Sequence, residues 1–153
     1  MMKNYNYLIV TLLIALFPFF SYGEEFSIST KNNLISELRP GQKVTAGFMN
    51  IAVSEDATII KIEAEMIGRI EAHSMIMDDE IMKMRKITPE LEKYKYCQFK
   101  PGGNHLMLFD IKRELKAGGN IKLLFTFEIK NKKILSKSIL FDIQRDVEGF
   151  HSF

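Results

Sequence analysis

Cysteine and tryptophan are the scarcest residues in this 153-residue chain, which has one cysteine, Cys97, and no tryptophan. A single cysteine excludes an intrachain disulfide framework and any zinc or iron–sulfur site built from several thiolates. Net charge is also small, because 21 Lys and Arg face 19 Asp and Glu for a formal charge of +2. No basic field is therefore available to attract nucleic acid or an acidic membrane surface.

The N-terminal residues 1–23 contain one charged side chain, Lys3, and no acid. A 13-residue apolar run, Leu8–Phe20, is followed by Ser21 and Gly23 at positions −3 and −1 of a cleavage site after Gly23. This pattern predicts a secretory signal peptide over residues 1–23. A membrane anchor is the alternative, but the run is shorter than the ~20 residues that a spanning helix needs. We expect no membrane insertion after cleavage.

The remainder of the chain predicts an all-β fold. Short runs rich in Val, Ile, Phe, Tyr and Thr alternate with turn residues, at the spacing of an antiparallel sandwich or barrel. One domain is expected over residues 24–146, followed by a flexible tail over residues 147–153, and Asn32–Leu38 is expected to form a short helix. The predicted strands are Val44–Val53, Thr58–Met66, Arg69–Met77, Ile81–Ile87, Tyr94–Lys100, His105–Ile111, Ile121–Ile129 and Ile134–Ile143.

Methionine is the residue in excess, with nine in the chain, and five of them lie close to two of the three histidines. Three segments of alternate residues carry this cluster: His73, Met75 and Met77; Met82 and Met84; His105 and Met107. Alternate residues of a strand share a face, so each segment presents its His and Met side chains together. The intervening Ile70, Ala72, Ser74 and Ile76 are the expected core lining.

The loop between Met77 and Met82 decides whether the first two segments meet. A loop of two or four residues pairs Met77 with Met82 and Met75 with Met84, and places His73 diagonal to Met84 at roughly 7–8 Å. A three-residue loop without a bulge would put His73 and Met84 on opposite faces. The sequence leaves these registers open.

Two imidazoles and several thioethers suit a particular metal. Zinc prefers imidazole, thiolate and carboxylate, whereas calcium and magnesium need oxygen. Thioether is a soft ligand that selects Cu(I), and the imidazoles must be neutral to bind, so acid should weaken binding near their pKa of ~6.5. The sequence leaves open whether Cu(II) also binds.

Three other interpretations compete with a Cu(I) site. Methionines also fill irregular gaps in protein cores. A blue-copper electron-transfer site would use Cys97 thiolate with two histidines and an axial Met, although Cys97 lies eight residues before His105. A metal-free exported β-sandwich that binds another molecule is the third. An enzyme is not expected, because the sequence contains no nucleophile–base pair or paired-carboxylate motif.

The chain resembles the PCuAC family of periplasmic copper chaperones, whose motif is H-x10-M-x21-H-x-M. Ten residues separate His73 from Met84, twenty separate Met84 from His105, and Met107 completes the motif. The spacing that is one residue short falls over a predicted loop at Thr88–Lys93. The resemblance covers about residues 38–130, and its most specific part is the run Lys100–Leu115.

The resemblance implies a cupredoxin-like Greek-key β-sandwich that carries Cu(I) in the periplasm, with His73, Met84, His105 and Met107 as ligands. It further implies delivery to the CuA centre of cytochrome c oxidase, with oxidase subunit II or a Sco-type protein as the partner. A copper sink that uses the same site is an alternative role. We expect a monomer, and no second copper site in the tail, where His151 is the sole histidine.

Overall fold

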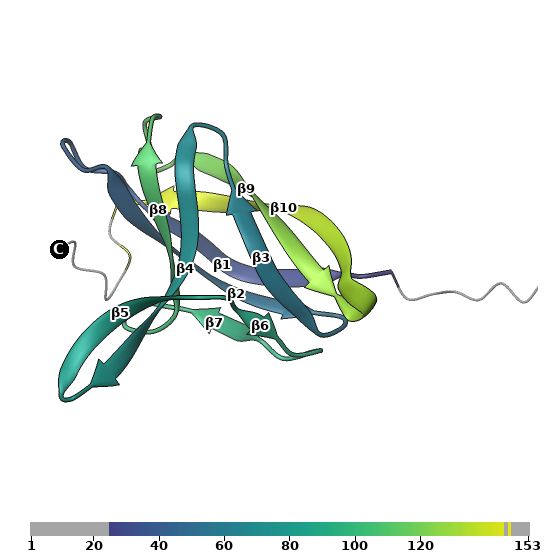
Figure 1. Cartoon of the computed structure of the whole chain (residues 1–153). Coiled ribbons are helices and arrows are strands. Elements are labelled where there is room, and N and C mark those ends of the chain that lie inside the picture. Colours follow the sequence, from purple (N-terminus) through teal and green to yellow (C-terminus); the bar gives the residue numbers. More distant parts are fainter. Residues whose placement is uncertain (1–24, 146, 148–153) are drawn as a thin grey trace, which may run out of the picture.

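The computed structural model describes residues 25–145 and residue 147, and in this part of the chain it is almost entirely β-structure (Figure 1). One short 3-10 turn, η1 (Lys130–Lys132), joins the last two strands. The strands are β1 (Ile28–Ser36), β2 (Val44–Val53), β3 (Ala57–Glu63), β4 (Ile67–Asp78), β5 (Ile81–Ile87), β6 (Glu90–Leu91), β7 (Cys97–Phe99), β8 (His105–Ile111), β9 (Asn120–Ile129) and β10 (Lys133–Gln144).

The strands form one hydrogen-bonded sheet that folds over on itself into two layers. Its order is β5-β4-β8-β2-β1-β10-β9-β3-β6, and β7 pairs separately with β2. Neighbouring strands run antiparallel, apart from β1 and β10, which pair in parallel through Leu34, Ile35 and Ser36. In Figure 1, β4 and β3 cross in front of β1 and β2. The predicted cupredoxin-like β-sandwich is confirmed.

The main core lies between the two layers and is filled by alternate residues of the long strands. Phe125 and Phe127 of β9 and Phe141 of β10 are fully buried there, and the Phe125 ring stacks against Phe141 at 6.2 Å between centroids. From the other layer, Leu106 and Leu108 of β8 are also fully buried. Burial of these side chains removes a large apolar area from water and supplies most of the folding free energy.

Three of the predicted strands agree with the structure at both ends. The bounds of β2, β5 and β8 agree with the predicted Val44–Val53, Ile81–Ile87 and His105–Ile111. The predicted strand Tyr94–Lys100 is too long, however, because the observed strand β7 covers only Cys97–Phe99. The two-residue strand β6 was not predicted, since it consists of one exposed glutamate and one buried leucine and carries no periodicity of its own.

The predicted helix at Asn32–Leu38 is wrong, because these residues belong largely to β1. Leu34 and Ile35 pair with β2 on one side and with β10 on the other, and Ile35 is fully buried. Asn32 adopts a φ of +54° where the β1–β2 register shifts, which is a β-bulge. The adjacent asparagines thus mark a bulge inside a strand, and tertiary pairing outweighs the local helical pattern.

Most of the two predicted terminal segments lies outside the described residues. The signal peptide over residues 1–23 lies outside the described residues, as do residues 148–153 of the predicted tail. Val147 is described and buried, packing with Ala46 and Phe48 on the outer face of β2. Among residues 25–145 and 147, no helix has the length and apolar character to cross a membrane.

Candidate metal centre

Three neighbouring strands bring the four predicted ligand residues onto one face of the sheet. His73 lies on β4, Met84 on β5, and both His105 and Met107 on β8. The β4–β8 register places His73 directly opposite His105, and their ring centroids are 6.2 Å apart. Met107 lies opposite Glu71, the residue two before His73 on β4, so it shares this face.

The β4–β5 hairpin has the two-residue loop that the predicted Met pairs require. Asp79 and Glu80 form the loop with φ values of +48° and +64°, both in the left-handed region typical of a type I′ turn. Met77 therefore faces Met82, and Met75 faces Met84. His73 faces Lys86 and lies diagonal to Met84, as expected for this register.

The opposite face of the same strands belongs to the main core. Ile70 and Ala72 of β4 are buried against it, as predicted. Ser74 is half-buried and Ile76 is 36% exposed, so these two were wrongly assigned to the core lining. The reason is that β4–β8 pairing ends at His73 and β4 beyond it pairs with β5, in a hairpin that projects from the sandwich (Figure 1).

The His105 side chain is fixed in one tautomer. The residue is 5% exposed, and its Nδ1 lies 2.9 Å from the carbonyl oxygen of Gly103. A carbonyl oxygen accepts, so Nδ1 carries the proton and donates it. In the neutral ring the lone pair then sits on Nε2, which is the arrangement of a histidine that binds a metal through Nε2.

The His73 side chain is fixed in the reverse tautomer. Its Nε2 lies 3.0 Å from Oε2 of Glu71, which leaves the lone pair on Nδ1 of the neutral ring. That Nδ1 atom is buried and has no hydrogen-bond partner. Among the described residues, the only other buried side-chain nitrogen or oxygen atom without a hydrogen-bond partner is Oδ1 of Asn33. A buried acceptor without a donor is costly, and a metal ion at Nδ1 would satisfy it.

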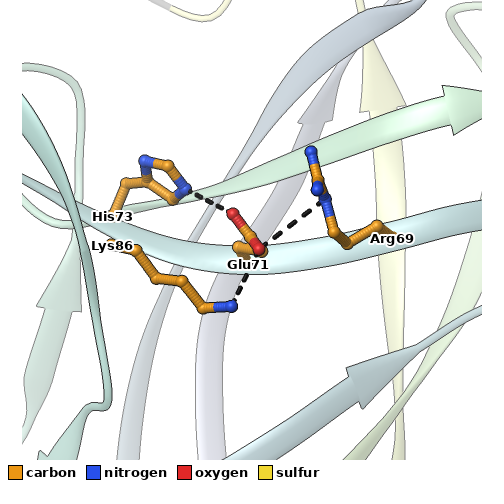
Figure 2. Close-up of polar contacts among 4 residues, drawn as sticks. All are labelled: Arg69, Glu71, His73 and Lys86. Carbon is orange, nitrogen blue, oxygen red and sulfur yellow. Dashed lines mark hydrogen bonds and ion pairs between the residues drawn. The ribbon is translucent and has the colours of Figure 1, made fainter.

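Glu71 holds this tautomer through a network on the same face (Figure 2). Its Oε1 accepts from Nζ of Lys86 at 2.8 Å, and Nε of Arg69 lies 3.6 Å away. The hydrogen bonds from Lys86 and then His73, helped by the charges of Lys86 and Arg69, lower the pKa of Glu71 to about 2 despite its partial burial. Glu71 is therefore an ionised acceptor at any physiological pH.

Accessibility increases from His105 toward the hairpin. The His73 side chain is 14% exposed, Met107 is half-buried against Ala46 and Phe48, and Met84 is 39% exposed. Within residues 25–145 and 147, no group of three or more His, Cys, Asp or Glu residues could hold a metal ion. A metal centre on this face would therefore combine imidazole nitrogen with thioether sulfur.

Cys97 lies on the other side of the sheet from the two histidines. It pairs with Ile51 of β2, on the face whose residues pack into the main core, and it is half-buried against that core. Burial raises the pKa of its thiol. Met107 pairs with Ala46, on the opposite face of β2. A thiolate site that joins Cys97 to His105 would have to cross the sheet, so the blue-copper alternative is not supported.

The sequence analysis missed Glu71, Arg69 and Lys86. The signal was present, because Glu71 and Arg69 lie two and four residues before His73 and so share its face. The Thr88–Lys93 loop, where the motif is one residue short, lies away from the ligands: it contains β6, which pairs with β3 in the other layer.

Comparison with known proteins identifies the family. Residues 28–135, which are more than two thirds of the chain, match the model of the LpqE-like lipoproteins, a PCuAC-type family. The chain belongs to this family. The predicted resemblance to PCuAC proteins is thereby confirmed.

A curated relative and several solved structures also match the chain. An uncharacterized protein of Rickettsia prowazekii, RP573, is 35% identical over 86 residues, 55% of this chain and 48% of the relative, so the match spans about half of that protein. The apo PCuAC domain of PmoF1 superposes with a TM-score of 0.59 at 14% identity, covering 78% of this chain and 94% of the domain.

A second PCuAC domain gives the same result in two states. The copper-bound domain of PmoF2 has a TM-score of 0.58 at 12% identity, with 78% of this chain and 93% of the domain covered. The apo domain of PmoF2 has a TM-score of 0.57 at 13% identity, with 79% and 94% covered. At these identities the likeness shows a shared fold.

Proposed function

We propose that this protein is a periplasmic Cu(I)-binding metallochaperone that uses His73, Met84, His105 and Met107 as ligands. The observation that carries the proposal is the buried Nδ1 of His73, which has no hydrogen-bond partner. It belongs to a ring that faces the His105 ring across the β4–β8 ladder, on the face that also carries Met107 and Met84. Copper is the cargo here and not a resident cofactor.

The donor types favour Cu(I) over other metals of the cell envelope. Thioether sulfur is soft and selects Cu(I), whereas Zn²⁺ would seek a thiolate or carboxylate and Ca²⁺ a set of oxygens. Glu71 is the nearest carboxylate, but its two oxygens already accept from His73 and Lys86. Thioethers also form no disulfides, which suits an exported protein.

The family supports a binding role without catalysis. The chain belongs to a PCuAC-type family, and one structure with the same fold is described as a copper-bound PCuAC domain. Imidazoles, thioethers and a permanently ionised carboxylate provide ligands for a metal ion. They provide no nucleophile paired with a base, so we propose transport of the ion and no chemical change of a substrate.

The exposed position of Met84 suggests how copper would leave. Met84 is the most accessible of the four residues and lies on β5, the end strand of the sheet. A ligand from an acceptor protein could replace its thioether while the buried His105 still holds the ion. We propose the CuA centre of cytochrome c oxidase as the destination, with oxidase subunit II or a Sco-type protein as the acceptor.

An anaerobic Cu(I) competition titration against a chromophoric chelator tests the binding step. We expect the mature chain, residues 24–153, to compete for Cu(I), and Met84→Leu to weaken that binding. Met66→Leu is the matched control, because Met66 is a 54% exposed methionine at the β3–β4 turn, outside the cluster. No competition by the unsubstituted chain, or equal affinity in Met84→Leu, would contradict the ligand assignment.

Incubation of the copper-loaded protein with the apo CuA domain of subunit II tests delivery. Copper transfer, followed by the appearance of the CuA absorption bands when an added oxidant removes one electron from the two-copper centre, would support the chaperone role. Retention of copper at equilibrium against a competent apo domain would instead favour the copper sink.

A further inference from the structure

The projecting β4–β5 hairpin carries more thioethers than the proposed ligand set uses. Met75 and Met77 of β4 face Met84 and Met82 of β5, so four methionines share one face of this two-stranded ribbon. Met77 is 66% exposed and Met82 is 50% exposed. Side chains that fill core gaps are buried, so packing does not account for these two residues.

The register brings these sulfur atoms within reach of one another. In a hairpin with a two-residue loop, the residues that flank the loop form a hydrogen-bonded pair, here Asp78 and Ile81. The next pair, Met77 and Met82, is then a non-hydrogen-bonded pair, and so is the pair Met75 and Met84. Cα atoms in such pairs are about 4.5 Å apart, and diagonal neighbours lie roughly 7–8 Å apart. Three long, unbranched side chains at these positions can converge on one ion.

The charged side chains of Asp78, Lys83 and Arg85, next to the loop, lie on the other face of the hairpin. Oδ2 of Asp78 accepts from Nζ of Lys83 at 2.9 Å and from Nη2 of Arg85 at 3.3 Å, so both basic side chains are held on that face. The face of Met75, Met77 and Met82 thus offers sulfur without a competing carboxylate. The loop acids Asp79 and Glu80 are exposed at the tip, where negative charge raises the local concentration of cations.

We propose that Met75, Met77 and Met82 form a second site, for a soft monovalent cation such as Cu(I) or Ag(I), on the hairpin beyond the first site. Three thioethers without an imidazole bind such an ion more weakly than the proposed His73 site does. The hairpin site is also the more exposed of the two, so an incoming ion would meet it first and then pass to the tighter site. This inference rests on the proposed function, because Met84 links the two sites.

The link between the two sites is the Met75–Met84 pair. Met84 lies opposite Met75 and diagonal to Met77, while His73 is the next residue of β4 on the same face. An ion held by Met75, Met77 and Met82 can exchange one thioether for that of Met84, and then reach the two imidazoles. Each step is a ligand substitution that leaves the oxidation state unchanged.

Ag(I) titration of the mature chain with 13C-labelled methionine methyl groups tests the second site. Ag(I) is soft and monovalent like Cu(I), but it is stable in air. We expect the first equivalent to shift the methyl signals of Met84 and Met107, and a second, weaker equivalent to shift those of Met75, Met77 and Met82. The Met77→Leu/Met82→Leu variant should lose the second equivalent and keep the first, whereas Met66→Leu should keep both.

The outcomes separate this proposal from the proposed function. If Met84 and Met107 shift while Met77 and Met82 respond no more than Met66, the hairpin site is wrong and the first site stands. If Met77 and Met82 shift while Met84 and Met107 do not, the hairpin site stands and the proposed function is wrong. If no methionine shifts, both are overturned.

Discussion

The two faces of β4 and β8 differ in what they contribute, although they are built from the same two strands. Toward the sandwich interior lie Ile70, Ala72, Leu106 and Leu108, none more than 8% exposed. Toward the outside lie His73, His105 and Met107, with polar and sulfur atoms that the core does not need. Because side chains alternate along a strand, one segment of sequence specifies a packing face and the proposed binding face together.

This comparison predicts that substitutions on the two faces separate binding from stability. The outer face should control metal affinity with small effects on folding, and the inner face should do the reverse.

Replacing both imidazoles, in His73→Ala/His105→Ala, should reduce Cu(I) affinity by well over a hundredfold, because both nitrogen ligands are lost. That loss exceeds the 10–100-fold effect typical of residues that only support a ligand. Chelator competition measures the affinity, and far-UV circular dichroism confirms the β-sheet. Retained affinity in a folded double variant would show that the outer face is not the binding face.

Leu108→Ala on the inner face should reduce the free energy of unfolding by about 2–5 kcal/mol, because it leaves a cavity in the fully buried core. Urea unfolding measures the change. Cu(I) affinity of the folded variant should stay near that of the unsubstituted protein. A loss of affinity in folded Leu108→Ala as large as in His73→Ala/His105→Ala would remove the distinction between the faces.

Glu71→Gln should reduce Cu(I) affinity by about 10–100-fold, because the neutral amide no longer accepts the His73 Nε2 proton through a charged oxygen. Long-range 15N NMR of the imidazole supplies a readout that a general structural role would not change. We expect the protonated nitrogen of His73 to be Nε2 in the parent protein and a tautomer mixture in Glu71→Gln. A parent His73 protonated on Nδ1 would contradict the assignment.

Cys97→Ser should leave Cu(I) affinity within about twofold, since the thiol lies on the core side of β2, opposite the face of Met107. The same chelator competition measures it. A large loss of affinity would show that a thiolate contributes to the site and would restore the blue-copper alternative.

The alternation of side chains along the strands allowed much of the candidate site to be predicted from the sequence. This alternation placed His73, Met75 and Met77 on one face of β4 and Ile70 and Ala72 on the other. The strands β5 and β8, which carry the other three predicted ligands, have the predicted bounds. The β4–β5 register could not be predicted, because it depends on the left-handed conformation of Asp79 and Glu80 in the loop. The sequence Asp-Glu does not indicate such a loop, since type I′ turns favour Asn-Gly and Asp-Gly.

Other features depend on contacts between distant segments. The strand β1 forms because Leu34 and Ile35 pair with β2 and β10, more than ten residues away on one side and about a hundred on the other. The tautomer of His73 depends on Glu71, whose charge is secured by Lys86 from the neighbouring strand. Neither the β1 pairing nor the Lys86–Glu71 hydrogen bond can be identified from local periodicity, whereas the two-residue spacing of Glu71 and His73 places these two on one face.

X-ray absorption spectroscopy of the Cu(I)-loaded mature chain tests the central claim most directly, because it reports the atoms bound to copper. The outer-face site predicts a mixed shell of nitrogen and sulfur at one equivalent of Cu(I), with the sulfur contribution reduced in Met84→Leu/Met107→Leu and unchanged in Cys97→Ser. A shell of nitrogen and oxygen without sulfur, or sulfur that disappears in Cys97→Ser, would contradict it.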